Sequence, residues 1–112
     1  MIEKVLFDYL NNAGLSADVY MEQPKVKPEA FFVLEKTGGS RTNHINESNF
    51  IVQSNGPSLA LAARMNEEIK AAIFDAITLN EISRVELNGD YNYSDPTTKQ
   101  YRYQGVYVIT HY

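Results

Sequence analysis

The chain of 112 residues contains no cysteine and no tryptophan. Without cysteine it can form no disulfide, has no thiolate nucleophile and offers no sulfur ligand to a metal. Its apolar runs are only a few residues long, too short for a membrane span or for the core of a secretory leader. The length and a composition of 44% hydrophobic and 21% charged residues predict a single globular domain over residues 1–112.

Positive charge is also scarce. Ten lysines and arginines stand against 14 acidic residues, which gives a formal net charge of −4. A protein that grips the phosphate backbone of a nucleic acid normally concentrates lysine and arginine on one face. The charge balance therefore argues against dedicated nucleic-acid binding.

No catalytic pattern is present. None of the serines lies in a Gly-x-Ser-x-Gly elbow, and Gly38-Gly39-Ser40 lacks the lysine of a phosphate-binding loop. His44 lies three residues before Glu47 in a polar segment, but no third ligand follows at a metal-binding spacing. We therefore predict a protein that is not an enzyme and that has no cofactor or metal site.

Two segments have the apolar periodicity of amphipathic helices. Residues 2–13 repeat an apolar face, and Gly14 follows where a helix end favours left-handed geometry. Residues 57–76 open with Pro57 and Ser58, which suit a first helical turn, and continue with an alanine-rich apolar stripe. The alanines predict that this second helix packs closely against a sheet.

Strands are predicted at residues 17–22, 31–34, 50–52, 82–93 and 99–112. The polar, glycine-bearing segment 37–46 predicts a mobile loop, and residues 94–98 predict a turn. Asn88-Gly89 fits either a second turn or a β-bulge. The expected fold is an α+β domain in the order α-β-β-β-α-β-β, with a mostly antiparallel sheet of about five strands and two helices on one face.

Tyrosine is concentrated near the end of the chain, where six of the eight occur in the last 22 residues. Alternation along a strand predicts that Val106 and Val108 face the core. The opposite, tyrosine-bearing face would then be a contact for another subunit, since tyrosine is frequent at interfaces. Tyrosine is also simply a good strand former, so an ordinary half-buried strand remains the alternative. The candidate subunit contacts are Tyr101, Tyr103, Tyr107 and Ile109.

The succession of elements resembles the tail terminator proteins of long-tailed bacteriophages, also called tail completion, minor capsid or head–tail joining proteins. The resemblance covers nearly the whole chain. It is carried by the opening helix and by the runs VYME, FFVLE, NFIVQ, SLALAARMNEEI and QYRYQGVYVI. None of these runs is a catalytic signature, and the chain is short for the family.

The resemblance implies a ring, typically of six copies, that caps the tail tube and joins it to the head. Its partners would be further copies of the chain, the major tail tube protein and the head–tail connector, while DNA passes through unread. The protein would occupy the host bacterial cytoplasm during assembly and then the virion tail, without contacting a membrane. The long polar loops 37–47 and 94–98 are the candidate partner contacts. Their named residues are Arg41, Asn43, His44, Asp95 and Thr97.

A second hypothesis is a small bacterial binding module, dimeric or RNA-contacting, that uses the aromatic C-terminal hairpin. The cations of that hairpin are only Arg84, Lys99 and Arg102. An aromatic platform with so little positive charge would bind RNA weakly.

Overall fold

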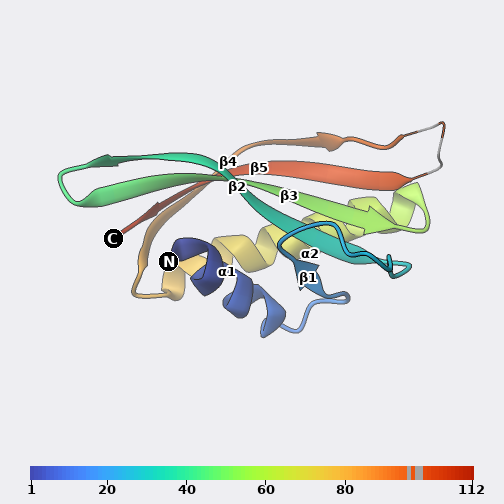
Figure 1. The fold of residues 1–112 in the computed structure, drawn as a ribbon, viewed down its shortest axis with the longest axis horizontal. Helices are drawn as coiled ribbons and strands as arrows, with labels where there is room; N and C mark the ends of the chain where they lie inside the picture. Colours follow the sequence, from blue (N-terminus) through green and yellow to red (C-terminus); the bar gives the residue numbers. More distant parts are fainter. Residues whose placement is uncertain (96, 98–99) are drawn as a thin grey trace.

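A computed structural model describes residues 1–95, 97 and 100–112. Two helices lie on one face of a long twisted sheet (Figure 1). The elements in chain order are α1 (Ile2–Asn11), β1 (Val19–Tyr20), β2 (Phe31–Thr42), β3 (Ile45–Gly56), α2 (Leu59–Asp75), the 3-10 turn η1 (Ala76–Thr78), β4 (Ile82–Asn92) and β5 (Tyr101–His111). The predicted α+β class and element order are confirmed.

The sheet has the strand order β1-β2-β3-β5-β4. The hairpins β2–β3 and β4–β5 are antiparallel, and they join through antiparallel pairing of β3 with β5. Only the two-residue β1 runs parallel to its neighbour, β2. The sheet is therefore mixed but mostly antiparallel, as predicted.

The helices begin and end where the sequence indicates. Ser58 caps α2, because its Oγ accepts a hydrogen bond from the Leu61 backbone N–H at 3.2 Å. Gly14 follows α1 with φ of +74°, the left-handed geometry expected of it. The core lies between the helices and the sheet. Its largest fully buried side chains include Leu6, Leu10, Phe32, Phe50, Met65, Ile69 and Tyr107.

The prediction of a mobile loop at residues 37–46 is wrong. This segment continues β2 to Thr42 and resumes as β3 at Ile45, with a tight turn between the strands. Asn43 and His44 form the turn with φ of +51° and +69°, the positive values of a two-residue hairpin turn. The two polar strands pair through Thr42↔Ile45, so backbone pairing holds the segment without apolar burial.

The predicted core face of the last strand is also wrong. Tyr107 and Ile109 are fully buried beneath the helices, whereas Val106 and Val108 are only half-buried on the other face. The buried face follows the partner strand, because Tyr107 pairs with the core residue Phe50. Tyr107 and Ile109 therefore belong to the core of the chain itself and are not subunit contacts.

The last hairpin agrees with its predicted strands. A register shift between Leu87 and Gly89 shows that Asn88-Gly89 is a bulge and not a turn. The predicted turn 94–98 and the start of the predicted strand 99–112 include Pro96, Thr98 and Lys99, which lie outside the described residues. In the described part of the chain, neither helix is long and apolar enough to cross a membrane.

Candidate interaction surfaces

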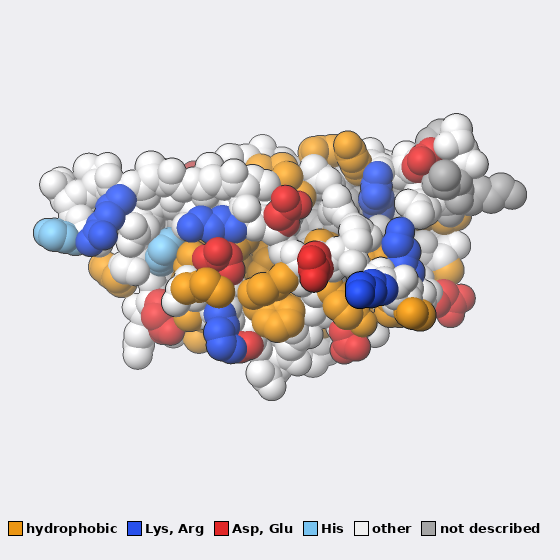
Figure 2. Space-filling view, in the orientation of Figure 1, with side chains coloured by type: hydrophobic (Ala, Val, Ile, Leu, Met, Phe, Trp, Pro, Cys, Tyr) orange, Lys and Arg blue, Asp and Glu red, His pale blue; other side chains and the backbone are white. Residues whose placement is uncertain are grey.

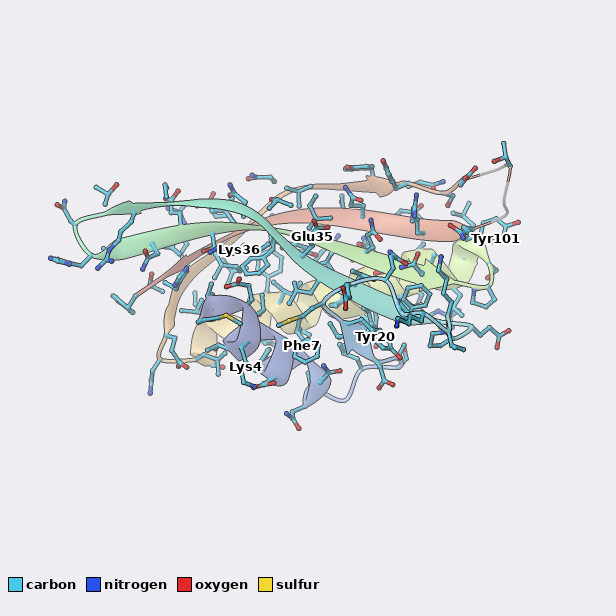
Figure 3. All side chains as sticks on the ribbon, viewed as in Figure 1. Lys4, Phe7, Tyr20, Glu35, Lys36 and Tyr101 are labelled. Atoms are coloured by element: carbon cyan, nitrogen blue, oxygen red, sulfur yellow. The ribbon has the colours of Figure 1, made fainter. Side chains whose placement is uncertain are left out.

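The outer half of the β2–β3 hairpin begins over α1, where Lys36 lies, and its turn end extends past both helices (Figures 1 and 3). We call residues 35–47 the hairpin arm. Its side chains are exposed on both faces, apart from the half-buried Gly38 and Asn46. A segment with so little burial gains almost nothing from the core, and exposed segments of this kind commonly carry binding.

The tip of the arm brings together three predicted partner contacts. Arg41, Asn43 and His44 surround the turn, and the Arg41 guanidinium lies 3.3 Å from His44 Nδ1. Next to them, Ile45 is 43% exposed, an apolar side chain at the end of a polar ribbon. The tip therefore combines a cation, hydrogen-bonding groups and one apolar contact.

The other predicted partner contacts lie at the opposite end of the sheet. The β4–β5 connection adjoins the Gly56–Tyr101 end of the sheet, whereas the tip of the arm, Thr42–Ile45, lies beyond the Asn46–His111 end. In this connection the Asp95 carboxylate accepts hydrogen bonds from the Thr97 backbone N–H at 3.0 Å and from the Thr97 hydroxyl at 2.7 Å. The two predicted contact loops do not form one surface.

The sheet face opposite the helices carries a row of hydrogen-bonded amides. Gln23 Nε2 donates to Gln53 Oε1 at 3.1 Å, and Gln53 Nε2 donates to Gln104 Oε1 at 3.3 Å. Gln104 Nε2 then donates to the Tyr91 hydroxyl at 2.7 Å. The row crosses β3 and β5 to β4 and fixes these side chains in place.

An aromatic cluster lies at the end of this row. Tyr91 and Tyr93 pack edge to face with ring centroids 6.0 Å apart, and both are nearly half exposed. The Arg102 guanidinium lies 4.8 Å from the centre of the Tyr93 ring, and its Nε donates to the Tyr93 carbonyl at 2.9 Å. The exposed tyrosines of the last hairpin are therefore Tyr91 and Tyr93 on β4 and its end and Tyr112 after β5, whereas the predicted Tyr101 and Tyr103 are half-buried.

A buried serine–histidine pair lies at the base of the arm. Ser48 Oγ and His111 Nε2 are 2.7 Å apart, and His111 Nδ1 lies 3.3 Å from the main-chain oxygen of Tyr112. That oxygen can only accept, so Nδ1 carries the proton and Nε2 accepts the Ser48 hydroxyl proton. Burial lowers the pKa of His111, and the Lys36 cation adds to that effect. The imidazole is therefore neutral in the folded protein at pH 7.

In this pair the serine hydroxyl donates to the histidine, as it does in a catalytic serine with a histidine base. However, Ser48 is only 2% exposed and cannot present its oxygen to a substrate carbonyl. It borders an open cavity of about 450 Å³, which we call the hairpin cavity. The residues that line it include Lys36, Arg41, Asn46, Glu47, Ser48 and His111.

A second polar group, of the buried Asn66 and the half-buried Lys70 and Asp90, joins α2 to β4. Lys70 Nζ lies 2.6 Å from Asp90 Oδ2, and Asn66 Nδ2 donates to the same oxygen at 2.7 Å. The hydrogen bond from Lys70 is the main cause of the lowered pKa of Asp90. Burial, followed by the Asp90 charge, raises the pKa of the neighbouring Tyr107 phenol. This group fastens the helix to the sheet, and none of its three residues lines the hairpin cavity.

Sequence reasoning missed both the serine–histidine pair and the amide row. Ser48 and His111 are 63 positions apart, and only the β3–β5 register brings them together. Within the described residues no three histidine or acidic side chains are close enough to hold a metal ion.

Comparison with known proteins does not assign the chain to a family. No protein-family model matches it, and no curated protein matches it.

Proposed function

We propose that the chain is the subunit of a ring that ends the tail tube of a long-tailed bacteriophage or prophage and joins it to the head connector. The resemblance described above suggests this role. The observation that supports it best is the hairpin arm, a paired ribbon of exposed residues that extends past the body of the domain. A partner that covered this ribbon would bury surface that the isolated domain leaves exposed, and that burial would stabilise the complex.

The experiment uses purified protein alone and mixed with tubes of the major tail protein. Light scattering measures the mass of the free protein, and negative-stain electron microscopy shows whether a ring covers one end of each tube. We expect rings at tube ends and tubes that stop growing. A protein that stays monomeric and never binds a tube would exclude the proposal.

A matched pair of variants tests the arm itself. Ile45 at the tip and Ile77 in η1 are exposed to similar extents, 43% and 51%. Ile45→Asp should abolish tube capping, whereas Ile77→Asp should leave it unchanged. If rings still form but both variants cap tubes equally well, the ring proposal stands and the arm is not its contact.

The Tyr93–Arg102 stack favours a second candidate, a binding module that contacts single-stranded RNA. Exposed tyrosine rings with an adjacent guanidinium are a stacking platform for bases. Salt-dependent binding of a single-stranded RNA, lost in Tyr93→Ala and kept in Tyr112→Ala, would support it. Tyr112 is a suitable control because it is 71% exposed.

A further inference from the structure

We propose that the hairpin cavity binds a small oxyanion, a phosphate or carboxylate group, between Lys36 and Arg41. The proposal concerns the free protein and does not depend on the ring. Basic and histidine side chains lie at the end of the molecule where the arm projects, and further basic side chains lie at the opposite end (Figure 2). The protein as a whole has a net charge of −4.

The strand register places the two cations on the same face of the sheet. Residues that are paired across neighbouring strands lie on the same face of the sheet. Phe50, Ser48 and Asn46 are every second residue of β3, so these three and the residues paired with them all lie on the face that carries the helices. The three rows that cross β2, β3 and β5 are Lys36–Phe50–Tyr107, Gly39–Ser48–Ile109 and Arg41–Asn46–His111. Ser48 is therefore central, with a cation in the row on either side.

The central row carries no β2 side chain, because its β2 residue is Gly39. A Cβ there would lie 2.8 Å from the Glu47 carbonyl oxygen and 3.7 Å from Lys36 Cε, so the strands approach closely and the Lys36 side chain lies beside the glycine. The rows of Lys36 and Arg41 are four residues apart along β3, about 13 Å, which two long side chains can bridge toward the middle. Both cations line the hairpin cavity, so a small anion in that cavity would have one cation on each side.

The cations have little competing charge. Lys36 reaches one carboxylate, Glu3, at 4.0 Å, the outer limit of an ion pair, and it lies where the arm leaves the helices (Figure 3). Arg41 contacts no carboxylate within ion-pair distance in the described part of the chain. Glu47 also borders the cavity, but it alternates with Asn46 and Ser48 along β3, so its side chain lies on the opposite face of the sheet from the two cations.

His111 links the site to proton uptake, because it is among the residues that line the cavity. In the free protein the imidazole is neutral and accepts the Ser48 hydroxyl proton. When His111 takes up a proton, the imidazolium adds a positive charge beside the bound anion. Binding should therefore proceed with proton uptake and strengthen as the pH falls. Charged groups near the imidazole are Lys36, Glu3, Glu81 and the Met1 amine.

The test follows the His111 ring by NMR during titration with sodium phosphate and, separately, with sodium acetate. Sodium chloride at matched ionic strength is the reference. We expect a saturable shift of the His111 signal and a raised His111 pKa in at least one oxyanion. Saturation by phosphate alone identifies a phosphoryl ligand, and saturation by acetate alone identifies a carboxylate ligand. Shifts equal to those in chloride overturn the proposal.

Matched variants locate the binding. Lys36→Gln and Arg41→Gln should each weaken binding about tenfold, the loss expected for one charge-assisted hydrogen bond. Lys4→Gln and Arg84→Gln remove the same charges from α1 and β4, where each pairs with a nearby carboxylate, and should leave binding unchanged. If all four variants bind equally well, the anion is elsewhere and the proposal is wrong. Circular dichroism checks that each variant is folded.

Discussion

The ring of Tyr107 packs against Gly105, two residues earlier on β5. A Cβ at Gly105 would lie 2.8 Å from Tyr107 Cε2 and 3.1 Å from its hydroxyl oxygen. Because glycine has no side chain, the Tyr107 ring can lie directly over the Gly105 backbone. Tyr107 is fully buried in the core, so a change at either residue of this pair alters the packing of the core.

Gly105→Ala should destabilise the fold by about 1 to 3 kcal/mol, because the added methyl overpacks the core. Urea unfolding measures the loss. Gly89→Ala is the control, since no heavy atom lies within 4 Å of a Cβ there, and it should change stability by less than about 0.5 kcal/mol. In a Tyr107→Val background the cost of Gly105→Ala should largely disappear. An equal cost in both backgrounds would contradict the contact.

Asp90→Asn should destabilise the protein by about 1 kcal/mol at pH 7, because Lys70 and Asn66 lose a charged acceptor. The lowered pKa of Asp90 means that its ionised form stabilises the fold above the ordinary value of 3.8 and stops doing so as the pH falls through the lowered value. Wild type and variant should therefore converge in acid, as measured by urea unfolding from pH 7 to pH 2. Asp8→Asn removes an exposed pair and should cost only a few tenths of a kcal/mol.

Acidification should destabilise the protein through His111. Its pKa is lowered in the fold, so the unfolded chain takes up a proton first, and stability falls as the pH drops below the ordinary value of 6.5. His111→Gln should flatten this part of the pH profile, measured by urea unfolding between pH 7.5 and pH 5. His44→Gln should retain the wild-type drop because His111 is still present. A profile unchanged by His111→Gln would refute the assignment.

The turn at the arm tip should accept glycine. His44 has φ of +69°, where glycine carries no steric cost, and Asn-Gly is the preferred pair for such turns. His44→Gly should therefore stabilise the arm by about 0.5 kcal/mol, and His44→Val should destabilise it. Hydrogen exchange of the arm amides measures the change locally. Equal protection in both variants would argue against this turn.

The sequence predicted the helices, the last two strands and the element order, because these rest on apolar periodicity and on capping residues. It failed at the hairpin arm, where polar strands are held by backbone pairing and leave no apolar pattern. It also failed to predict which face of β5 is buried. Both faces carry apolar residues, and it is the pairing of Tyr107 with Phe50 that places one of them in the core.

Of the candidate partner contacts, Arg41, Asn43 and His44 surround a tight turn and do not lie in a loose loop, and their role as contacts stays a prediction. The hairpin cavity was beyond prediction. It depends on a register that brings residues 36–48 beside His111, and register is a property of the folded sheet.

The register shifts of the sheet have a consequence for behaviour at high concentration. Among the described pairs they occur only at Lys36/Gly38 on β2 and at Ile82/Arg84 and Leu87/Gly89 on β4, whereas β3 and β5 pair without a break. β4 is the outer strand, and β2 has no outer neighbour beyond its short pairing with β1. An irregular edge is a poor template for a further strand, so the molecule can accumulate without seeding cross-β fibres.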